Sequence, residues 1–157
     1  MSPNAIEIPK GLIDSTPSIA TLLRLASYYA ERKLPEKGLD SEVVFDCPRM
    51  QLMVRTAVRG TVIGNHFHSV CDEIVAVVGG TGEILVNGVW LPVKAGDVHV
   101  CPRGIVHDTR ALSESLQYLS VFPPHLPPGG DLNFVGGKHV HDRFQGCRVR
   151  LRRRMAG

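Results

Sequence analysis

The chain has 157 residues, of which 43% are hydrophobic and 21% are charged, and its mean hydropathy is +0.02. This length predicts a single domain with a sizeable core, and the composition excludes a disordered chain, a coiled coil and a membrane span. Five of the 18 Lys and Arg residues lie between Arg148 and Arg154, and without them the 15 acidic residues outnumber the basic ones. We therefore expect no nucleic-acid partner.

Two further features concern the compartment. The N-terminus has no basic segment followed by an apolar stretch, so we expect no secretion signal and no membrane anchor. The four cysteines are spaced 24, 30 and 46 residues apart, without a Cys-x-x-Cys pair, which excludes a zinc ribbon and a thioredoxin-like site. The sequence thus predicts free thiols and a cytoplasmic location.

Residues 1–41 are expected to form an N-terminal arm and one helix. Thr16 and Pro17 are typical of a helix start, and apolar residues at i, i+3, i+4, i+7 and i+11 from Ile19 place one stripe on a helix. The pattern predicts an amphipathic helix over residues 17–33 that ends before Pro35, with its stripe packed in a core or an interface. One helix does not make a helix-turn-helix, which argues against a transcription factor.

Residues 42–124 read as short β-branched segments separated by glycine or proline, which predicts an all-β antiparallel sandwich or barrel. The pair Asn87-Gly88 indicates a two-residue hairpin. Residues 125–157 form a C-terminal extension, which adds an edge strand or wraps the body and ends in a mobile Arg-rich tail. The expected strands are Val43–Asp46, Met50–Val58, Asn65–Val70, Glu73–Val78, Gly82–Val86, Val89–Val93, Val98–Cys101, Ile105–Thr109 and Leu116–Phe122.

A histidine-rich block follows the second of these strands. Alternate side chains share one face of a strand, so His66 and His68 point the same way. Glu73 opens the next strand after a short turn and can return to that face. Two imidazoles and a carboxylate that converge in this way predict a divalent-metal site.

A second block contains Gly96, Pro102, Gly104 and His107. Pro102 and Gly104 predict a tight turn that redirects the chain. His107 then lies near the start of a new strand, where it can supply a fourth ligand.

Together the two blocks resemble the motifs of the cupin superfamily. The first motif, G-x5-H-x-H-x(3,4)-E-x6-G, is matched from Gly60 to Gly80, and the second, G-x5-P-x-G-x2-H-x3-N, is matched from Gly96 except that Ala111 replaces the final Asn. The motifs lie 15 residues apart, as in small single-domain members. The resemblance implies a double-stranded β-helix, or jelly roll. It also implies that the metal ligands are His66, His68, Glu73 and His107.

For several other residues the position in a strand predicts which face the side chain occupies. His99 and Cys101 share a face, which we expect to point outward, while an inward face would place them beside the metal ligands. Arg55 and Arg59 are expected to face solvent, because Leu52, Val54, Thr56 and Val58 read as the core-facing set; a carboxylate clamp is the alternative.

Three remaining features are read as structural. Cys71 is expected to be a small loop residue rather than a reactive thiol. His139 and His141 repeat the His-x-His spacing without a nearby glutamate, which favours a surface position. Val75 and Val77 share the strand face of Glu73 and are expected to form an apolar wall of the pocket.

Three imidazoles and one carboxylate leave up to two positions open on an octahedral ion, which is typical of a catalytic site. We favour a non-haem Fe(II) dioxygenase-type oxidoreductase acting on a small polar or enolisable molecule, with Mn, Ni, Zn, Cu or Co as other metals. The alternatives are a non-oxidative isomerase, decarboxylase or lyase, and a small-ligand-binding or sensor module without turnover. A homodimer is expected, because jelly rolls expose sheet edges.

Overall fold

The computed structural model describes residues 24–136 and 148–151, and the chain divides into two units, residues 1–33 and 34–157. In the first unit the structure describes α1 (Leu25–Ala30), a helix without buried residues that is too short to cross a membrane. The helix ends three residues earlier than predicted, because the charged residues 31–33 do not continue the apolar stripe. The predicted helix is also wrong at Arg24, which is extended, and its stripe residues Ala26 and Ala30 do not lie in the core. The predicted residues 17–23 lie outside the described part of the chain.

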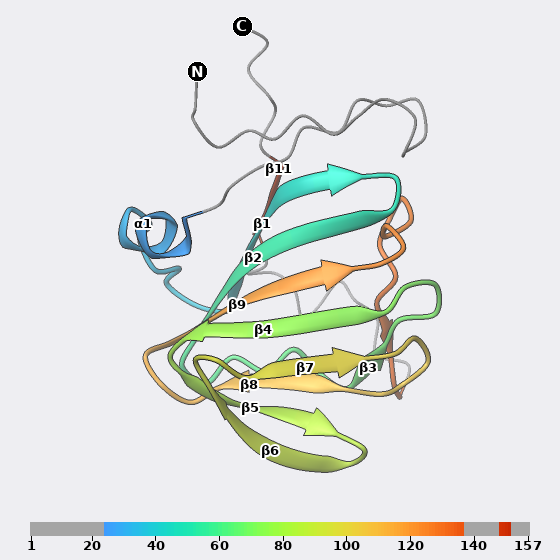
Figure 1. Ribbon diagram of the computed structural model, residues 1–157. Coiled ribbons are helices and arrows are strands. Elements are labelled where there is room, and N and C mark those ends of the chain that lie inside the picture. Colours follow the sequence, from blue (N-terminus) through green and yellow to red (C-terminus); the bar gives the residue numbers. More distant parts are fainter. Residues whose placement is uncertain (1–23, 137–147, 152–157) are drawn as a thin grey trace, which may run out of the picture. The chain divides into compact units, whose positions relative to one another are not determined.

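The second unit consists of strands in three sheets (Figure 1). The largest sheet has the order β11-β1-β2-β9-β4-β7, a second has the order β6-β5-β8, and β10 pairs with β3. All pairs are antiparallel except β1 and β11. The strands are β1 (Leu39–Cys47), β2 (Met50–Val58), β3 (His66–Phe67), β4 (Glu73–Gly79), β5 (Thr81–Val86), β6 (Val89–Lys94), β7 (Val98–Cys101), β8 (Asp108–Ala111), β9 (Ser115–Phe122), β10 (Asn133–Phe134) and β11 (Arg148–Leu151).

Most of the predicted strands are confirmed, including the hairpin at Asn87-Gly88, but the strand expected over Asn65–Val70 is reduced to the two residues of β3. Both turn residues have positive φ, 49° and 81°, and Val86 pairs with Val89 across the turn. The strand expected over residues 105–109 is wrong at its start: a turn closed by a hydrogen bond from the Ile105 amide to the Pro102 carbonyl delays β8 to Asp108. The C-terminal extension does add an edge strand, β11, inside the run that was expected to be mobile.

Strict alternation marks the inner face of the largest sheet. In β9 the side chains of Leu116, Tyr118, Ser120 and Phe122 are buried while their neighbours are not. In β4 the residues at 73, 75 and 77 are buried in the same way, so the two valines share the inner face with Glu73. They pack in the hydrophobic core and are not among the described residues that line the cavity, so the predicted pocket wall is wrong. Burial of these apolar side chains supplies the main stabilisation of the barrel.

The phase predicted for β2 is wrong. The odd-numbered residues Gln51, Met53 and Arg55 line an internal cavity, so Arg55 faces the interior and not solvent. Both faces of this strand carry apolar or β-branched residues, and Val54 is as well buried as Met53. The period-two pattern was therefore ambiguous, and pairing with β1 and β9 decides the phase.

The phase favoured for β7 is also wrong. Val98 and Val100 are exposed by 64% and 60%, while Cys101 is buried and His99 is half-buried, so the latter two side chains face inward. Exposed valines on a short strand give no signal that could fix the phase of β7 from sequence.

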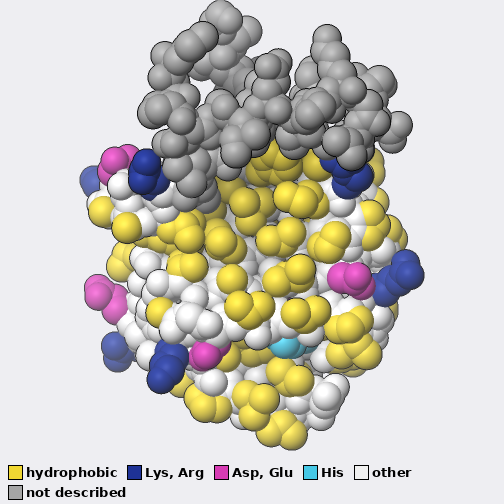
Figure 2. Space-filling model, in the orientation of Figure 1, with side chains coloured by type: hydrophobic (Ala, Val, Ile, Leu, Met, Phe, Trp, Pro, Cys, Tyr) yellow, Lys and Arg dark blue, Asp and Glu magenta, His cyan; other side chains and the backbone are white. Residues whose placement is uncertain are grey.

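The molecular surface is largely apolar on one side. On the face drawn in Figure 2, hydrophobic side chains cover much of the surface and charged ones lie mainly toward its edges.

The segment after β9 returns to the loop before β4 and pairs with β3 through β10. Its anchor is the buried Asp131, whose carboxylate accepts hydrogen bonds from the amides of Ser69, Val70 and Cys71 at 2.7–3.1 Å and from the Ser69 hydroxyl at 2.6 Å. Burial alone would raise the pKa of Asp131, but these donors hold it well below its ordinary value. One carboxylate thus fastens residues 131–134 to the loop before β4.

Gly80 is predicted to tolerate no side chain. Its φ is +76°, and an added Cβ would lie 1.9 Å from the Ser115 carbonyl oxygen. Gly80→Ala should lower the free energy of unfolding by about 3 kcal/mol or more, while the control Gly88→Ala, with φ +81° and open space, should lose about 1–2 kcal/mol. Urea denaturation measures both, and equal losses would contradict the steric argument.

Asp131→Asn should lower the free energy of unfolding by about 2 kcal/mol at pH 7, because charge-assisted hydrogen bonds are lost. The control Asp97→Asn removes the charge from an acceptor of one exposed amide and should cost less than about 0.5 kcal/mol. A lowered folded pKa stabilises above the unfolded pKa of about 3.9, so the gap between wild type and Asp131→Asn should shrink as the pH falls below 4. A gap that stays constant down to pH 2 would refute the charged role.

Candidate metal centre

Four side chains from separate elements meet inside the barrel. His66 lies in β3, His68 follows it, Glu73 opens β4 and His107 immediately precedes β8. The main chains of His66 and His107 form a bridge, with each amide donating to the other's carbonyl at 3.0 and 2.8 Å. All four residues are only 2–4% exposed.

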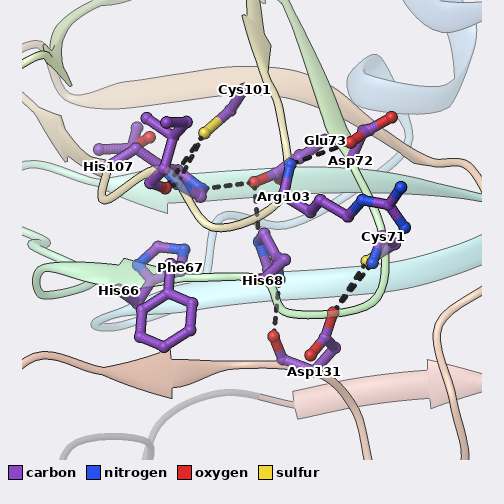
Figure 3. A network of polar contacts seen from close by, with 12 residues as sticks. His66, Phe67, His68, Cys71, Asp72, Glu73, Cys101, Arg103, His107 and Asp131 are labelled. Atoms are coloured by element: carbon purple, nitrogen blue, oxygen red, sulfur yellow. Dashed lines mark hydrogen bonds and ion pairs between the residues drawn. The ribbon is translucent and has the colours of Figure 1, made fainter.

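The four functional groups lie within reach of a common centre (Figure 3). One ligand atom from each residue can be chosen so that all lie within 4.8 Å of one another. The Glu73 Oε2 atom is 2.9 Å from Nε2 of His107 and 3.2 Å from Nε2 of His68. The ring centres of His66 and His107 are 4.3 Å apart. The predicted cluster is therefore confirmed as one that could bind a metal ion.

The tautomers of the three imidazoles are set by the main chain. Each Nδ1 lies within hydrogen-bond distance of a carbonyl oxygen, and a carbonyl can only accept, so each Nδ1 carries a proton. The distances are 2.7 Å from His66 to Gly64, 2.8 Å from His68 to Asp131 and 3.0 Å from His107 to Ile105. All three Nε2 atoms are left for the centre, which is the arrangement that metal-binding histidines require.

Electrostatics distinguish the members of the cluster. Burial lowers the pKa of His66 to about 3, so this imidazole is neutral. Burial opposes the charged form of His107, but hydrogen bonds with Cys101 and Glu73 outweigh it and raise the pKa to about 10. Burial likewise opposes the charge on Glu73, yet hydrogen bonds from His107 and His68 hold its pKa well below its ordinary value. The interior thus holds an ionised carboxylate among imidazoles.

Two aspartates that sequence reasoning did not assign to the site hold its ligands in place. Asp108 is buried, and its Oδ1 accepts from the Gly64 amide at 2.9 Å, which fixes the residue whose carbonyl orients His66. Asp131 offers its carbonyl to His68, as described above. The only hint of Asp108 was its place beside His107, and Asp131 carried none, because its partners lie about 60 residues away.

The turn in the second motif also contacts the centre. The Gly104 amide donates to the His68 carbonyl at 2.7 Å, and Gly104 has a φ of +80°. The Arg103 amide donates to the Asp72 carboxylate at 2.9 Å. The predicted turn is confirmed, and it joins the second motif to the first by main-chain hydrogen bonds.

The two neighbours predicted beside the ligands differ in their contacts. The Cys101 sulfur is 2.9 Å from Nδ1 of His107. The His99 ring centre lies 6.2 Å from that of His107, and its Nδ1 has no hydrogen-bond partner within the described residues. Only Cys101 touches a ligand directly, and a role for either side chain in chemistry remains a prediction.

The remaining sequence interpretations concern three positions. Cys71 is fully buried, and burial together with Asp131 raises the pKa of its thiol to about 12, which supports the loop reading. Ala111 is buried in the core, so its methyl group packs where the motif has Asn. His139 and His141 lie outside the described residues.

A cavity of about 600 Å³ adjoins the centre. His68 and Arg55 form part of its wall, and Nη1 of Arg55 is 4.0 Å from Oε1 of Glu73. Its roof is the segment from His125 to Leu132, and the rest of its wall is mainly apolar. The volume lies within the range of small-molecule sites.

Comparisons with known proteins agree with this geometry. The sequence profile described as "Cupin domain" matches residues 53–122. KdgF from Halomonas sp. is 28% identical, with a TM-score of 0.54 over 55% of this chain and 79% of that one. A conserved protein of unknown function from Streptococcus pyogenes is 26% identical, with a TM-score of 0.56 over 67% and 88% of the two chains.

A third structure supports the fold alone. It is a protein with a double-stranded β-helix domain from Klebsiella pneumoniae, 24% identical, with a TM-score of 0.57 over 67% of this chain and 90% of that one. No curated protein sequence gives a significant match. The profile, the β-helix architecture and the two motifs agree, and residues 53–122 of this chain form a cupin domain.

Proposed function

We propose that this protein is a metal-dependent cupin enzyme that acts on a small molecule. The observation that carries the proposal is the convergence of three Nε2 atoms, each with its Nδ1 proton held by a carbonyl, on the carboxylate of Glu73. Imidazole and carboxylate ligands suit Fe, Mn, Ni, Zn, Cu and Co, and we favour Fe(II) and an oxygen-dependent oxidation. A bound ion would supply Lewis acidity, and Fe(II) would also supply redox chemistry toward O₂.

The chain's own residues would hold and shield the reacting molecule. His66, His68, Glu73 and His107 would ligate the ion beside the cavity, whose wall includes His68. Val75 and Val77, both buried, keep water away from the inner sheet face. Low polarity around the ligands strengthens each electrostatic contact inside the site.

Removal of one ligand should abolish metal retention. His66→Ala deletes one of the three imidazoles. The variant should hold less than about a tenth of the metal of the wild type, because the ion loses one of its four ligands. The control His125→Ala removes an imidazole on the cavity roof and should keep the full metal content. Elemental analysis of protein purified without added metal, with circular dichroism to verify folding, gives the comparison. Full occupancy in His66→Ala would overturn the ligand assignment.

Oxygen uptake distinguishes the reaction classes. The Fe(II)-loaded protein should consume O₂ with at least one member of a panel of small acids and diketones, while the Zn-loaded protein should not. Conversion of a substrate without oxygen uptake would contradict the oxygen-dependent oxidation and indicate a non-oxidative isomerase, decarboxylase or lyase. Binding without conversion under any metal would contradict catalysis and leave a ligand-binding module.

A further inference from the structure

The cavity beside the metal centre has a marked charge asymmetry. Among the described residues that line it, Arg55 is the only lysine or arginine. Its guanidinium also lies over the Phe122 ring, with 5.5 Å between Cζ and the ring centre. The one carboxylate in the wall, that of Asp131, already accepts from three amides and a hydroxyl. The wall therefore presents a cation to a ligand, and the described carboxylate that pairs with this cation is that of Glu73, 4.0 Å away.

Ser41 lies next to Arg55 on the same sheet face. The two residues are directly paired between β1 and β2, and both line the cavity. Ser41 is 2% exposed, and its Oγ is buried without a hydrogen-bond partner within the described residues. A buried hydroxyl without a partner costs free energy, which an oxygen atom from a ligand would recover.

The rest of the wall sets the character of the remainder of the ligand. Leu39, Val43, Met53, Phe122 and Leu126 supply apolar surface. Arginine presents a planar fork of donors that matches a carboxylate, and a neighbouring hydroxyl can donate to the same group. The complementary molecule has one carboxylate and a short apolar body.

We propose that this cavity is the substrate site and that it takes small carboxylic acids, whose carboxylate binds to Arg55 and Ser41. The inference rests on the proposed metal-dependent function, because Arg55 lies 4.0 Å from the ligand carboxylate of Glu73. A carboxylate held by Arg55 would lie close to the metal centre, together with the carbon atom bonded to it. The substrate class is thus an acid that is transformed close to its carboxyl group.

The test compares an acid with a neutral amide of the same shape. Calorimetry with 4-methylpentanoate and 4-methylpentanamide, on metal-free and on Zn-loaded protein, separates binding by Arg55 from binding by the ion. The acid should bind at least about tenfold more tightly than the amide in both forms, since a charge-assisted pair is involved. Equal affinities of acid and amide for the wild type would overturn the proposal without any variant.

Matched variants assign the preference to residues. Arg55→Gln should lose at least about tenfold in affinity for the acid and little for the amide, and Ser41→Ala should lose about three- to tenfold. The exposed Arg59→Gln serves as the control and should bind as the wild type does. An Arg55→Gln protein that folds and keeps the acid preference would refute the assignment.

Metal content measured on the same samples distinguishes the two proposals. Acid preference without metal binding upholds the carboxylate site and refutes the metal function. Metal binding without acid preference upholds the metal function and refutes the carboxylate site.

Discussion

The buried carboxylate of Glu73 is the constraint around which this barrel is organised. A charge removed from water is tolerated only where opposite charge or hydrogen-bond donors replace the lost solvation. The Nε2 atoms of His68 and His107 lie 3.2 and 2.9 Å from one oxygen, and Arg55 lies 4.0 Å from the other. The buried Glu73 carboxylate therefore needs positive charge beside it. The proton on His107 supplies such a charge, and a divalent cation would also supply it.

The histidines serve this centre only because the main chain fixes their orientation. Three carbonyls, from Gly64, Ile105 and Asp131, hold the Nδ1 protons. The carbonyls of Gly64 and Ile105 lie two residues before the histidines that they orient, whereas that of Asp131 comes from a segment 63 residues after His68. The C-terminal segment therefore contributes to the centre although it lies beyond the cupin domain, since Asp131 both orients His68 and fastens the neighbouring loop.

The part of the site that follows from local spacing could be predicted from the sequence. His66 and His68 lie two residues apart at the end of β3, Glu73 begins β4, and the turn at Gly104 precedes His107. What failed were the features decided by tertiary pairing. Strand β2 carries apolar residues on both faces, so its phase, and with it the inward position of Arg55, depended on its neighbours in the sheet. Asp131 was missed because its hydrogen-bond partners lie 60 to 62 residues away.

The phase of β2 has a chemical consequence that links the two halves of the site. Because side chains alternate, the register that points Arg55 inward also places Met53 on the cavity wall, on the same sheet face. The cation is thus presented in apolar surroundings, where its interaction with an anion is stronger than in water. An apolar molecule of equal size would leave the Ser41 hydroxyl unpaired, and an unpaired buried polar group discriminates more strongly than a lost methylene. Selection for acids then follows from the sheet register that also sets Arg55 beside Glu73.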